Sequence, residues 1–246
     1  MGYTDLHCHL LPAVDDGPDT MAESLAYAAE AVAAGTTTIV ATPHVEAVDV
    51  AELSDRVDEL KAALAREGID LDVRRGGELK PFSIPELTDA DLDLIAHGPP
   101  GARWLLYEVP FHGPDDEFVA GAHELRDRGF GLLLAHPERS RGMVDGGGLA
   151  VIEGLVAGGA AVAANTGPLI GREGTDRRRA AEHLLNRCVP TVLATDAHAP
   201  SRPYTLPMAA EAAERVTGRA DRARRLAVEA PARLLADGLS AARRAA

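Results

Sequence analysis

The sequence predicts an α/β protein built from parallel strands, and three observations indicate this fold class. Seven short β-rich runs alternate with longer amphipathic segments. The runs are almost continuously apolar, as is typical of parallel strands that are buried on both faces. Nearly every run ends in a potential metal ligand, and the carboxyl ends of strands converge in a closed parallel barrel. The polar residues therefore favour a TIM-like barrel over an open doubly wound sheet, although composition alone allows both.

The expected strands and helices follow in order along the chain. The strands are Tyr3–His9, Thr37–Thr42, Leu71–Gly76, Trp104–Val109, Gly131–Ala135, Ala160–Asn165 and Thr191–Thr195. One helix begins near Thr20, where Thr20-x-x-Glu23 has the pattern of a capping box. The next carries Leu53, Val57, Leu60 and Leu64 at helical spacing and ends near Gly68. Further helices fit Asp115–Arg128, Gly147–Ala157, Arg172–Asn186 and Pro207–Thr217.

No linker or composition break divides the 246 residues, so we expect a single domain over 1–246 with a helical C-terminal tail from about residue 220. The net charge of -13 repels nucleic acid and anionic lipid. Two cysteines, Cys8 and Cys188, cannot form a disulfide framework and favour a cytoplasmic location. The N-terminus lacks the pattern of a signal peptide, and Glu153 interrupts the most apolar stretch, so we expect no membrane insertion.

Imidazole and carboxylate side chains gather at the ends of the expected strands. His7 and His9 are two residues apart on one strand and share a face, and Asp196 and His198 repeat this spacing. These ligand types suit zinc, manganese or iron. Nine candidates exceed what one ion can use, so the sequence predicts two or three ions. The nine candidates are His7, His9, Asp16, His44, Glu78, Glu108, His136, Asp196 and His198.

Other polar residues receive weaker interpretations. Asp5 and Asp15 either orient ligands or serve solvation and capping, and the sequence leaves both readings open. Cys8 lies between two candidate ligands and should point to the opposite face, where it packs. The remaining histidines, which are assigned no role, are His97, His112, His123 and His183.

An ordered set of segments resembles the PHP family of metal-dependent phosphoesterases. Within it, the set is most similar to the tyrosine phosphatases of bacterial capsule and exopolysaccharide operons. The segments span residues 5 to 202 and read DLHCHLLPAVDDGP, TTTIVATPH, GGEL, YEVP, AHPER, NTGPL and ATDAH, with Arg202 following. Val45 and the short spacer before Arg202 depart from the family pattern. The resemblance implies a distorted (β/α)7 barrel that holds three divalent metal ions, manganese or iron, with zinc as an alternative.

The resemblance also implies roles for individual residues. One metal would be held by His7, His9, Glu78 and Asp196, a second by Glu78, Glu108 and His136, and a third by Asp16, His44 and His198. Arg139 and Arg202 would bind the phosphate. Apart from the resemblance, an alkyl leaving group would need a proton donor, for which Asp196, His198 or a metal-bound water are the candidates, and the sequence does not assign the role. A metal-bridging hydroxide would attack phosphorus in line without a phosphoenzyme. No Cys-x5-Arg loop of cysteine-based phosphatases is present.

The expected function is thus a protein-tyrosine phosphatase that acts on a phosphotyrosine protein, such as a polysaccharide-assembly kinase. The alternative is the same chemistry on a small phosphorylated metabolite of the histidinol phosphate kind. Amidohydrolase-type carbon–nitrogen hydrolysis is disfavoured, because the only lysines are Lys61 and Lys80. A non-catalytic metal-binding module and a nuclease are further readings, the nuclease being the weakest. The sequence does not determine the metal, the substrate or the oligomeric state, and it is compatible with a homo-oligomer.

Overall fold

Strands and helices alternate along the chain, as the sequence predicts. The computed structural model describes residues 2–187 and 191–241, and Cys188 lies outside this part. The strands are β1 (Tyr3–His9), β2 (Thr36–Ala41), β3 (Asp72–Arg75), β4 (Glu78–Leu79), β5 (Trp104–Glu108), β6 (Gly131–Ala135), β7 (Ala161–Asn165), β8 (Thr191–Ala194) and β9 (Ala197–His198). The helices are α1 (Met21–Ala33), α2 (Leu53–Arg66), α3 (Asp89–Ile95), α4 (Asp116–Asp127), α5 (Gly148–Ala157), α6 (Thr166–Leu169), α7 (Thr175–Asn186), α8 (Leu206–Thr217), α9 (Arg222–Arg224) and α10 (Ala230–Asp237).

The seven expected strands are present within a residue or two of their predicted ends. The capping box of α1 is confirmed, since Thr20 Oγ1 accepts the Glu23 N–H at 3.3 Å and the Glu23 carboxylate accepts the Thr20 N–H at 3.2 Å. The predicted start of α7 at Arg172 is wrong, because Gly174 has a φ of 92° that a helix cannot accommodate. The short elements β4, β9, α3 and α6 were not predicted.

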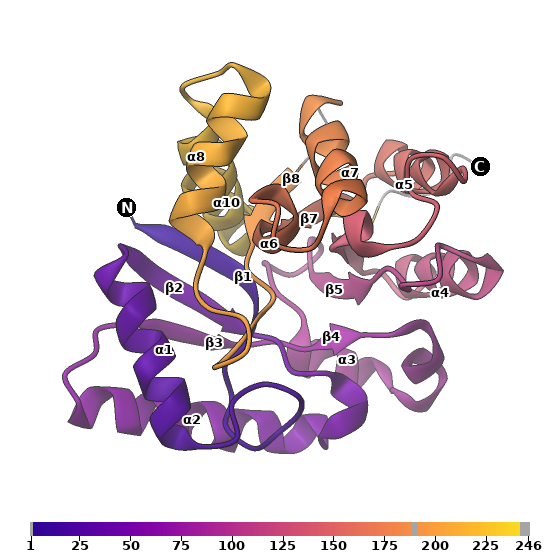
Figure 1. Cartoon of the computed structure of the whole chain (residues 1–246). Helices are drawn as coiled ribbons and strands as arrows, with labels where there is room; N and C mark the ends of the chain where they lie inside the picture. The colour runs from indigo at the N-terminus through magenta and orange to yellow at the C-terminus, as the bar shows by residue number, and fades with distance from the viewer. Residues whose placement is uncertain (1, 188–190, 242–246) are drawn as a thin grey trace.

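All strand pairs in the described chain are parallel, but their hydrogen bonds form two sheets. The orders are β3-β2-β1-β9 and β4-β5-β6-β7-β8. Two backbone hydrogen bonds connect the sheets, one at each seam: Glu78 N–H donates to Pro43 O at 2.9 Å, and Asp196 N–H donates to His7 O at 2.8 Å. The fold is therefore a mixed α/β architecture with parallel sheets, and the helices lie around the outside of the strands (Figure 1).

An apolar interior joins the two sheets. Small side chains such as Ala135 and Ala163 leave room there for the large ring of Trp104, which is fully buried. The cluster contains Leu6, Val40, Trp104, Leu106, Leu133, Ala135, Ala161, Ala163, Val192 and Ala194. A second, larger cluster forms where the outer faces of the strands meet the helices. Among the described residues, no helix combines the length and hydropathy needed to cross a membrane.

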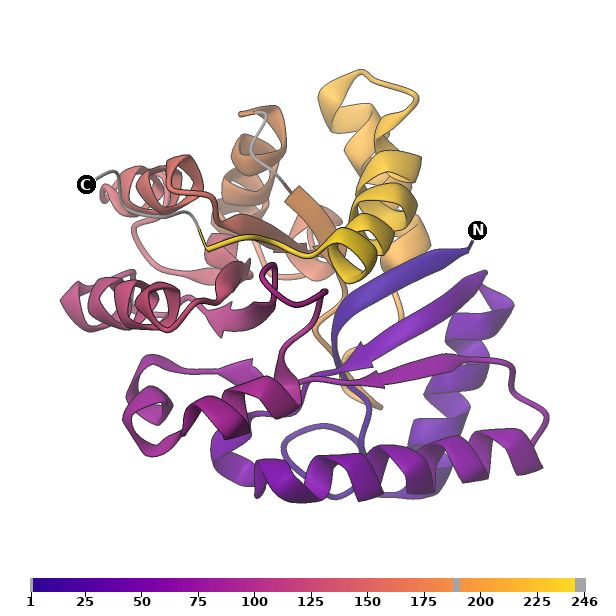
Figure 2. The ribbon, with the colours of Figure 1, turned by 180° about the vertical axis from the view of Figure 1, so that it is seen from behind.

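The C-terminal segment covers the amino-terminal ends of β5 and β6. Leu234, Leu235 and Leu239 pack against the interior cluster, and Trp104 Nε1 donates to Leu234 O at 2.8 Å. Leu239 N–H donates to Ala102 O at 2.8 Å, which fixes the chain after α10. Figure 2 shows this yellow segment running across the strands. The expected helical tail is therefore an integral part of the fold.

Substitution of Trp104 by phenylalanine should lower the free energy of unfolding by about 1–3 kcal/mol, because it removes the hydrogen bond to Leu234 and leaves space in the interior. Urea denaturation of the wild type and the Trp104→Phe variant measures the difference. Met208→Ala, at an apolar side chain that is 50% exposed on α8, should leave stability unchanged. Equal unfolding midpoints for the wild type and Trp104→Phe would contradict the role given to Trp104.

Candidate metal centre

The first polar side chains of the site come from a β-bulge in β1. Pairing with β2 shifts by one residue between Asp5 and Cys8. A one-residue shift reverses which side chains of a strand face inward. Leu6 therefore joins the apolar interior, whereas His7 and His9 lie together beside Glu78.

Asp5 stabilises this bulge. Its carboxylate accepts hydrogen bonds from the His7 N–H at 3.2 Å, the Thr195 N–H at 3.1 Å and the Thr195 hydroxyl at 2.5 Å. Burial raises the pKa of Asp5 to about 6, although the hydrogen bonds from Thr195 and His7 oppose this. Asp5 thus ties β1 to the end of β8 and positions His7, which matches the orienting role rather than solvation.

Glu78 lies at the centre of the site. Its carboxylate oxygens are 2.9 to 3.3 Å from ring nitrogens of four histidines, which are His7, His9, His44 and His136. Burial acts to raise the pKa of Glu78, but His7 and the hydrogen bonds from His136 and His9 hold it well below its usual range. Burial and the charge of Glu78 raise the pKa of nearby Glu108 to about 8. The histidines therefore stabilise the ionised form of Glu78, whereas the charge of Glu78 disfavours ionisation of Glu108.

Two glycines allow Glu78 to reach this position. A Cβ on Gly76 would lie 2.6 Å from Val40 Cγ1, and a Cβ on Gly77 would lie 2.8 Å from Val45 Cγ1. Real Cβ atoms do not approach this closely, so only glycine fits where the chain leaves β3 and crosses to β4. The expected strand over Leu71–Gly76 is assigned as Asp72–Arg75, and the Gly76 N–H still donates to Ala41 O at 2.9 Å.

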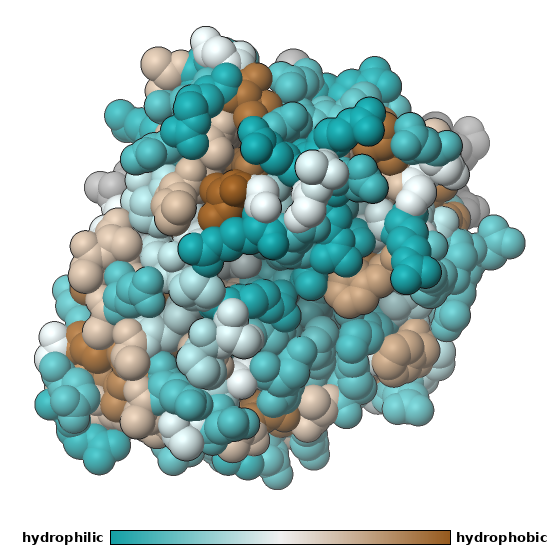
Figure 3. Space-filling model, in the orientation of Figure 1, coloured by the Kyte–Doolittle hydropathy of each residue, from teal (hydrophilic) through white to brown (hydrophobic). Residues whose placement is uncertain are grey.

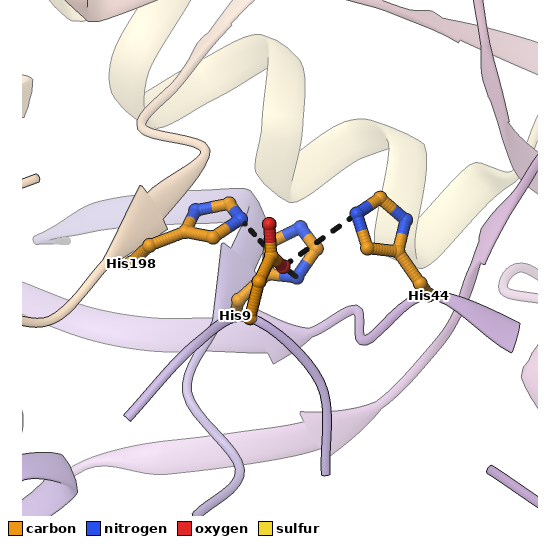
Figure 4. A group of neighbouring side chains, drawn as sticks. His9, His44 and His198 are labelled. Carbon is orange, nitrogen blue, oxygen red and sulfur yellow. Dashed lines mark ion pairs between the residues drawn. The ribbon is translucent and has the colours of Figure 1, made fainter. Parts of the chain in front are cut away.

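Three histidines and an aspartate form one side of the site. Figure 4 shows His9, His44 and His198 turned toward one another. Asp16 Oδ1 lies 3.7, 3.6 and 3.1 Å from nitrogens of these three rings, respectively. Asp15 orients the cluster, because its Oδ2 lies 2.6 Å from His9 Nδ1 and accepts the His44 N–H at 3.0 Å. Burial acts to lower the pKa of His9, but the hydrogen bonds to Asp15 and Glu78 raise it to about 10.

His136 and Asp196 are held in an uncommon backbone conformation. Their φ angles are 35° and 48°, in the left-handed region that non-glycine residues rarely adopt. Arg139 and Arg202 both donate to Asp196 Oδ2, the second at 2.6 Å, and Asn165 Nδ2 donates to the same oxygen at 3.0 Å. Burial acts to raise the pKa of Asp196, but His7, His136 and Arg202 lower it overall.

These residues fit divalent metal ions. Four groups have candidate ligand atoms within 4.8 Å of one another. The groups are His9, Asp16, His44 and His198; His7, His136 and Asp196; His7, His9 and Glu78; and His44, Glu78 and Glu108. In the described part of the chain, several buried atoms of this site form no hydrogen bond of suitable geometry, although His44 Nδ1 lies 3.2 Å from Glu78 and His198 Nε2 lies 3.1 Å from Asp16. These atoms are His44 Nδ1, His136 Nδ1, His198 Nε2 and Glu108 Oε2. Unpartnered nitrogen and carboxylate oxygen donors of this kind are ligands for zinc, manganese or iron.

A pocket of about 420 Å³ opens above these groups. Its floor includes Glu78, His136 and Asp196, and its rim includes two exposed phenylalanines, Phe82 and Phe111. The Phe111 ring stacks on His136 with centroids 5.7 Å apart, and the guanidinium of Arg139 lies 4.8 Å from the Phe111 centroid. The surrounding face of the molecule is largely hydrophilic, with separate apolar patches (Figure 3).

The structure brings all nine predicted ligands and both predicted arginines around this pocket. The four histidines without an assigned role are not among the grouped ligands, and His97 packs on Trp104 instead. Sequence reasoning missed Phe82 and Phe111. The available signal was their position, four residues after Glu78 and three after Glu108. It also missed Glu173, which accepts from Arg139 at 3.1 Å.

Glu138 is buried beside the site. Its Oε1 accepts the Asn165 N–H at 2.6 Å, which fixes the end of β7. Burial raises the pKa of Glu138 from 4.5 to about 8, although backbone hydrogen bonds from Glu138 and Asn165 act in the opposite direction. The folded chain therefore keeps this proton at neutral pH, whereas the unfolded chain releases it.

Replacement of Glu138 by glutamine should change how stability depends on pH. Because the folded pKa is raised, the wild type loses stability as pH rises from about 4.5 through about 8, and Glu138→Gln removes that contribution. Thermal unfolding at pH 5 and pH 8 should show the wild type losing more stability than the variant between the two values. Parallel pH profiles would contradict a protonated Glu138.

Comparison with known proteins agrees with this geometry. The chain is 32% identical over 198 residues to the tyrosine-protein phosphatase YwqE of Bacillus subtilis (strain 168), covering 79% of this chain and 76% of YwqE. It superposes with a TM-score of 0.82, at 28% identity and 94% coverage of both chains, on a chain from the crystal structures of YwqE from Bacillus subtilis and CpsB from Streptococcus pneumoniae, described as unique metal-dependent tyrosine phosphatases.

A more distant likeness concerns the fold alone. The phosphotriesterase homology protein of Escherichia coli matches with a TM-score of 0.54 at 15% identity, covering 94% of this chain and 90% of that protein.

The sequence model of the family described as capsular polysaccharide synthesis, CpsB/CapC, matches residues 3–236, nearly the whole chain. The resemblance expected from the ordered motifs is therefore confirmed, and the chain belongs to the CpsB/CapC family.

Proposed function

We propose that this protein is a metal-dependent phosphatase that hydrolyses phosphotyrosine in proteins. The observation that carries the proposal is the pocket itself, where nine imidazole and carboxylate groups lie beside two arginines and two exposed phenylalanine rings. The relatives named as tyrosine phosphatases support the same function.

The nine predicted ligands are the proposed metal-binding residues. We infer three divalent ions, manganese or iron, with zinc as the alternative. The groups that the geometry brings together overlap the ligand sets implied by the resemblance, with His9 placed next to Asp16, His44 and His198 as well. When bound, such ions would supply Lewis acidity and lower the pKa of a coordinated water to about 7.

Arg139 and Arg202 are the proposed phosphate-binding residues. Both guanidinium groups line the pocket and converge on Asp196. A planar guanidinium binds phosphate oxygens through two parallel hydrogen bonds and stabilises charge on phosphorus. Phe111 and Glu173 hold Arg139 from two sides, so this arginine does not have to be ordered by the substrate.

The rim favours an aryl ester over an alkyl ester. Of the four phenylalanines in the sequence, Phe82 and Phe111 stand at the pocket mouth with 58% and 45% of their surface exposed. Aromatic rings in this position would contact the ring of a tyrosine. A phenolate with a pKa near about 10 also leaves with little acid assistance. This suits the site, because both candidate proton donors have lowered pKa values. Against the effect of burial, His7, His136 and Arg202 lower the pKa of Asp196, and burial and His9 lower the pKa of His198 to about 4.

A small phosphorylated metabolite is the second candidate substrate, since the metal and phosphate groups would serve it equally. The exposed rings at the rim are the feature that argues against it. Carbon–nitrogen hydrolysis receives less support, because the ammonium of Lys80 lies 2.5 Å from Glu46 and 3.9 Å from Glu108 rather than among the histidines.

We also infer that the two sheets are arcs of one distorted barrel in a single domain. The hydrogen bonds at both seams, together with an apolar interior shared by β1, β2 and β5–β8, support this arrangement. A barrel explains why the site collects side chains from strands that belong to different sheets.

His136→Ala should reduce kcat/KM for a phosphotyrosine peptide by about 100-fold or more, because it removes a proposed ligand at the pocket floor. The matched control is His183→Ala on α7, which should retain activity within about twofold. Phosphate release by both variants is measured on protein analysed for bound metals, with about three equivalents per chain expected in the wild type. Equal activity in the two variants, or full activity after complete metal removal, would refute the proposal.

Phe82→Ala should lower kcat/KM for p-nitrophenyl phosphate and phosphotyrosine peptide by about three- to tenfold, through loss of apolar contact with the substrate ring. Activity on an alkyl phosphate, such as a phosphoserine peptide, should not change. The matched control is Met208→Ala, since Met208 is similarly exposed but does not line the pocket. An equal loss on aryl and alkyl esters would show that Phe82 does not select the ring.

A further inference from the structure

A second cavity, of about 480 Å³, lies directly beside the metal pocket. Arg139 and Arg202 line both cavities and form the wall between them. The lining of the second cavity also includes Arg172 and Arg177, from the segment between α6 and α7 and from the first turn of α7. A molecule whose phosphate reaches Arg139 therefore has this cavity within its immediate reach.

The charge of this cavity is opposite to that of the protein as a whole. Its lining contains four arginines and a single carboxylate, Glu173, in a chain with a net charge of -13. Glu173 is already engaged, because it accepts from Arg139 at 3.1 Å and from Arg177 at 2.6 Å. Arg139 and Arg202 also donate to Asp196, so the four arginines meet two carboxylates, and an excess of positive charge remains at the cavity.

The guanidinium of Arg172 is the group of this cavity that is most available to bind an anion. Within residues 2–187 and 191–241, no carboxylate forms an ion pair with Arg172, in contrast to Arg177 and Arg178 on the adjoining helix, which pair with Glu173 and Glu182. A guanidinium offers five donors in a fixed plane that matches carboxylate and phosphate oxygens.

We propose that this arginine-lined cavity is a subsite for a second anionic group of the substrate, a carboxylate or a phosphate close in sequence to the scissile phosphotyrosine. The proposal rests on the proposed phosphatase function and specifies its substrate class as an acidic or multiply phosphorylated segment. The negative surface elsewhere would repel such a segment, so binding at Arg172 would align it with its phosphate toward the metal pocket.

Steady-state kinetics with the metal-loaded enzyme test the subsite. The substrates are three phosphotyrosine peptides, with neutral neighbours, with aspartates next to the phosphotyrosine, or with a second phosphotyrosine, and p-nitrophenyl phosphate as a substrate without neighbours. Arg172→Ala should raise KM for whichever anionic peptide the wild type prefers by about five- to tenfold. The neutral peptide and p-nitrophenyl phosphate should change by less than about twofold, and Arg172→Lys should retain part of the preference.

The matched control is Arg178→Ala, which removes the same charge from α7 but lies outside the cavity lining. Preference for aspartate identifies a carboxylate subsite, and preference for the second phosphotyrosine identifies a phosphate subsite. The proposal is overturned when the wild type treats all three peptides alike, when Arg172→Ala affects every substrate equally, or when Arg178→Ala has the same effect as Arg172→Ala.

A binding measurement separates this proposal from the proposed function. Fluorescent peptides that carry a non-hydrolysable phosphonate in place of the phosphotyrosine ester report affinity by anisotropy without turnover. A loss of affinity in Arg172→Ala for anionic peptides alone would support the subsite even when no peptide is hydrolysed. Hydrolysis without any dependence on the neighbours would support the phosphatase and refute the subsite.

Discussion

The contact of one buried carboxylate with four imidazoles is the constraint on which the site depends. Glu78 can lie within 3.3 Å of His7, His9, His44 and His136 only when several chain segments converge to within a few ångströms. Burial of so many polar groups is unfavourable unless they compensate one another's charge. The imidazoles provide that compensation for Glu78, whereas Glu108 beside it is left with a raised pKa. The site is thus arranged to receive additional positive charge.

The backbone around Glu78 adopts locally unfavourable conformations that allow these segments to converge. The bulge after Asp5, the left-handed conformations of His136 and Asp196, and the glycine pair before Glu78 each depart from regular strand geometry. The left-handed residues and the glycine pair follow the carboxyl ends of β6, β8 and β3, and the bulge lies within β1 beside His7. The β5–β6 and β7–β8 pairs keep a regular parallel register, and their packing helps to hold these conformations in place.

Short-range patterns in the sequence predicted the strands, most helices and the set of residues that gather at the pocket. Alternation on a strand correctly placed His7 and His9 on one face, but it could not show the bulge, since that depends on contacts between Asp5 and Thr195, 190 positions apart. The sequence also did not predict that the strands form two sheets. Gly76 and Gly77 indicated the end of a strand, and not that the chain crosses there from one sheet to the other. Phe82 and Phe111 were missed since apolar residues in a sequence are expected to be buried.

The position of the C-terminal segment determines when, during synthesis, the interior of this protein can be closed. Leu234, Leu235 and Leu239 cover an interior to which Leu6, near the start of the chain, also belongs. A nascent polypeptide leaves the ribosome from its amino terminus, so the early strands emerge long before their cover does. The interior can be closed to water only after residues 234–239 have been translated, and a translation product that stops before them would present Trp104 and its neighbours to other chains.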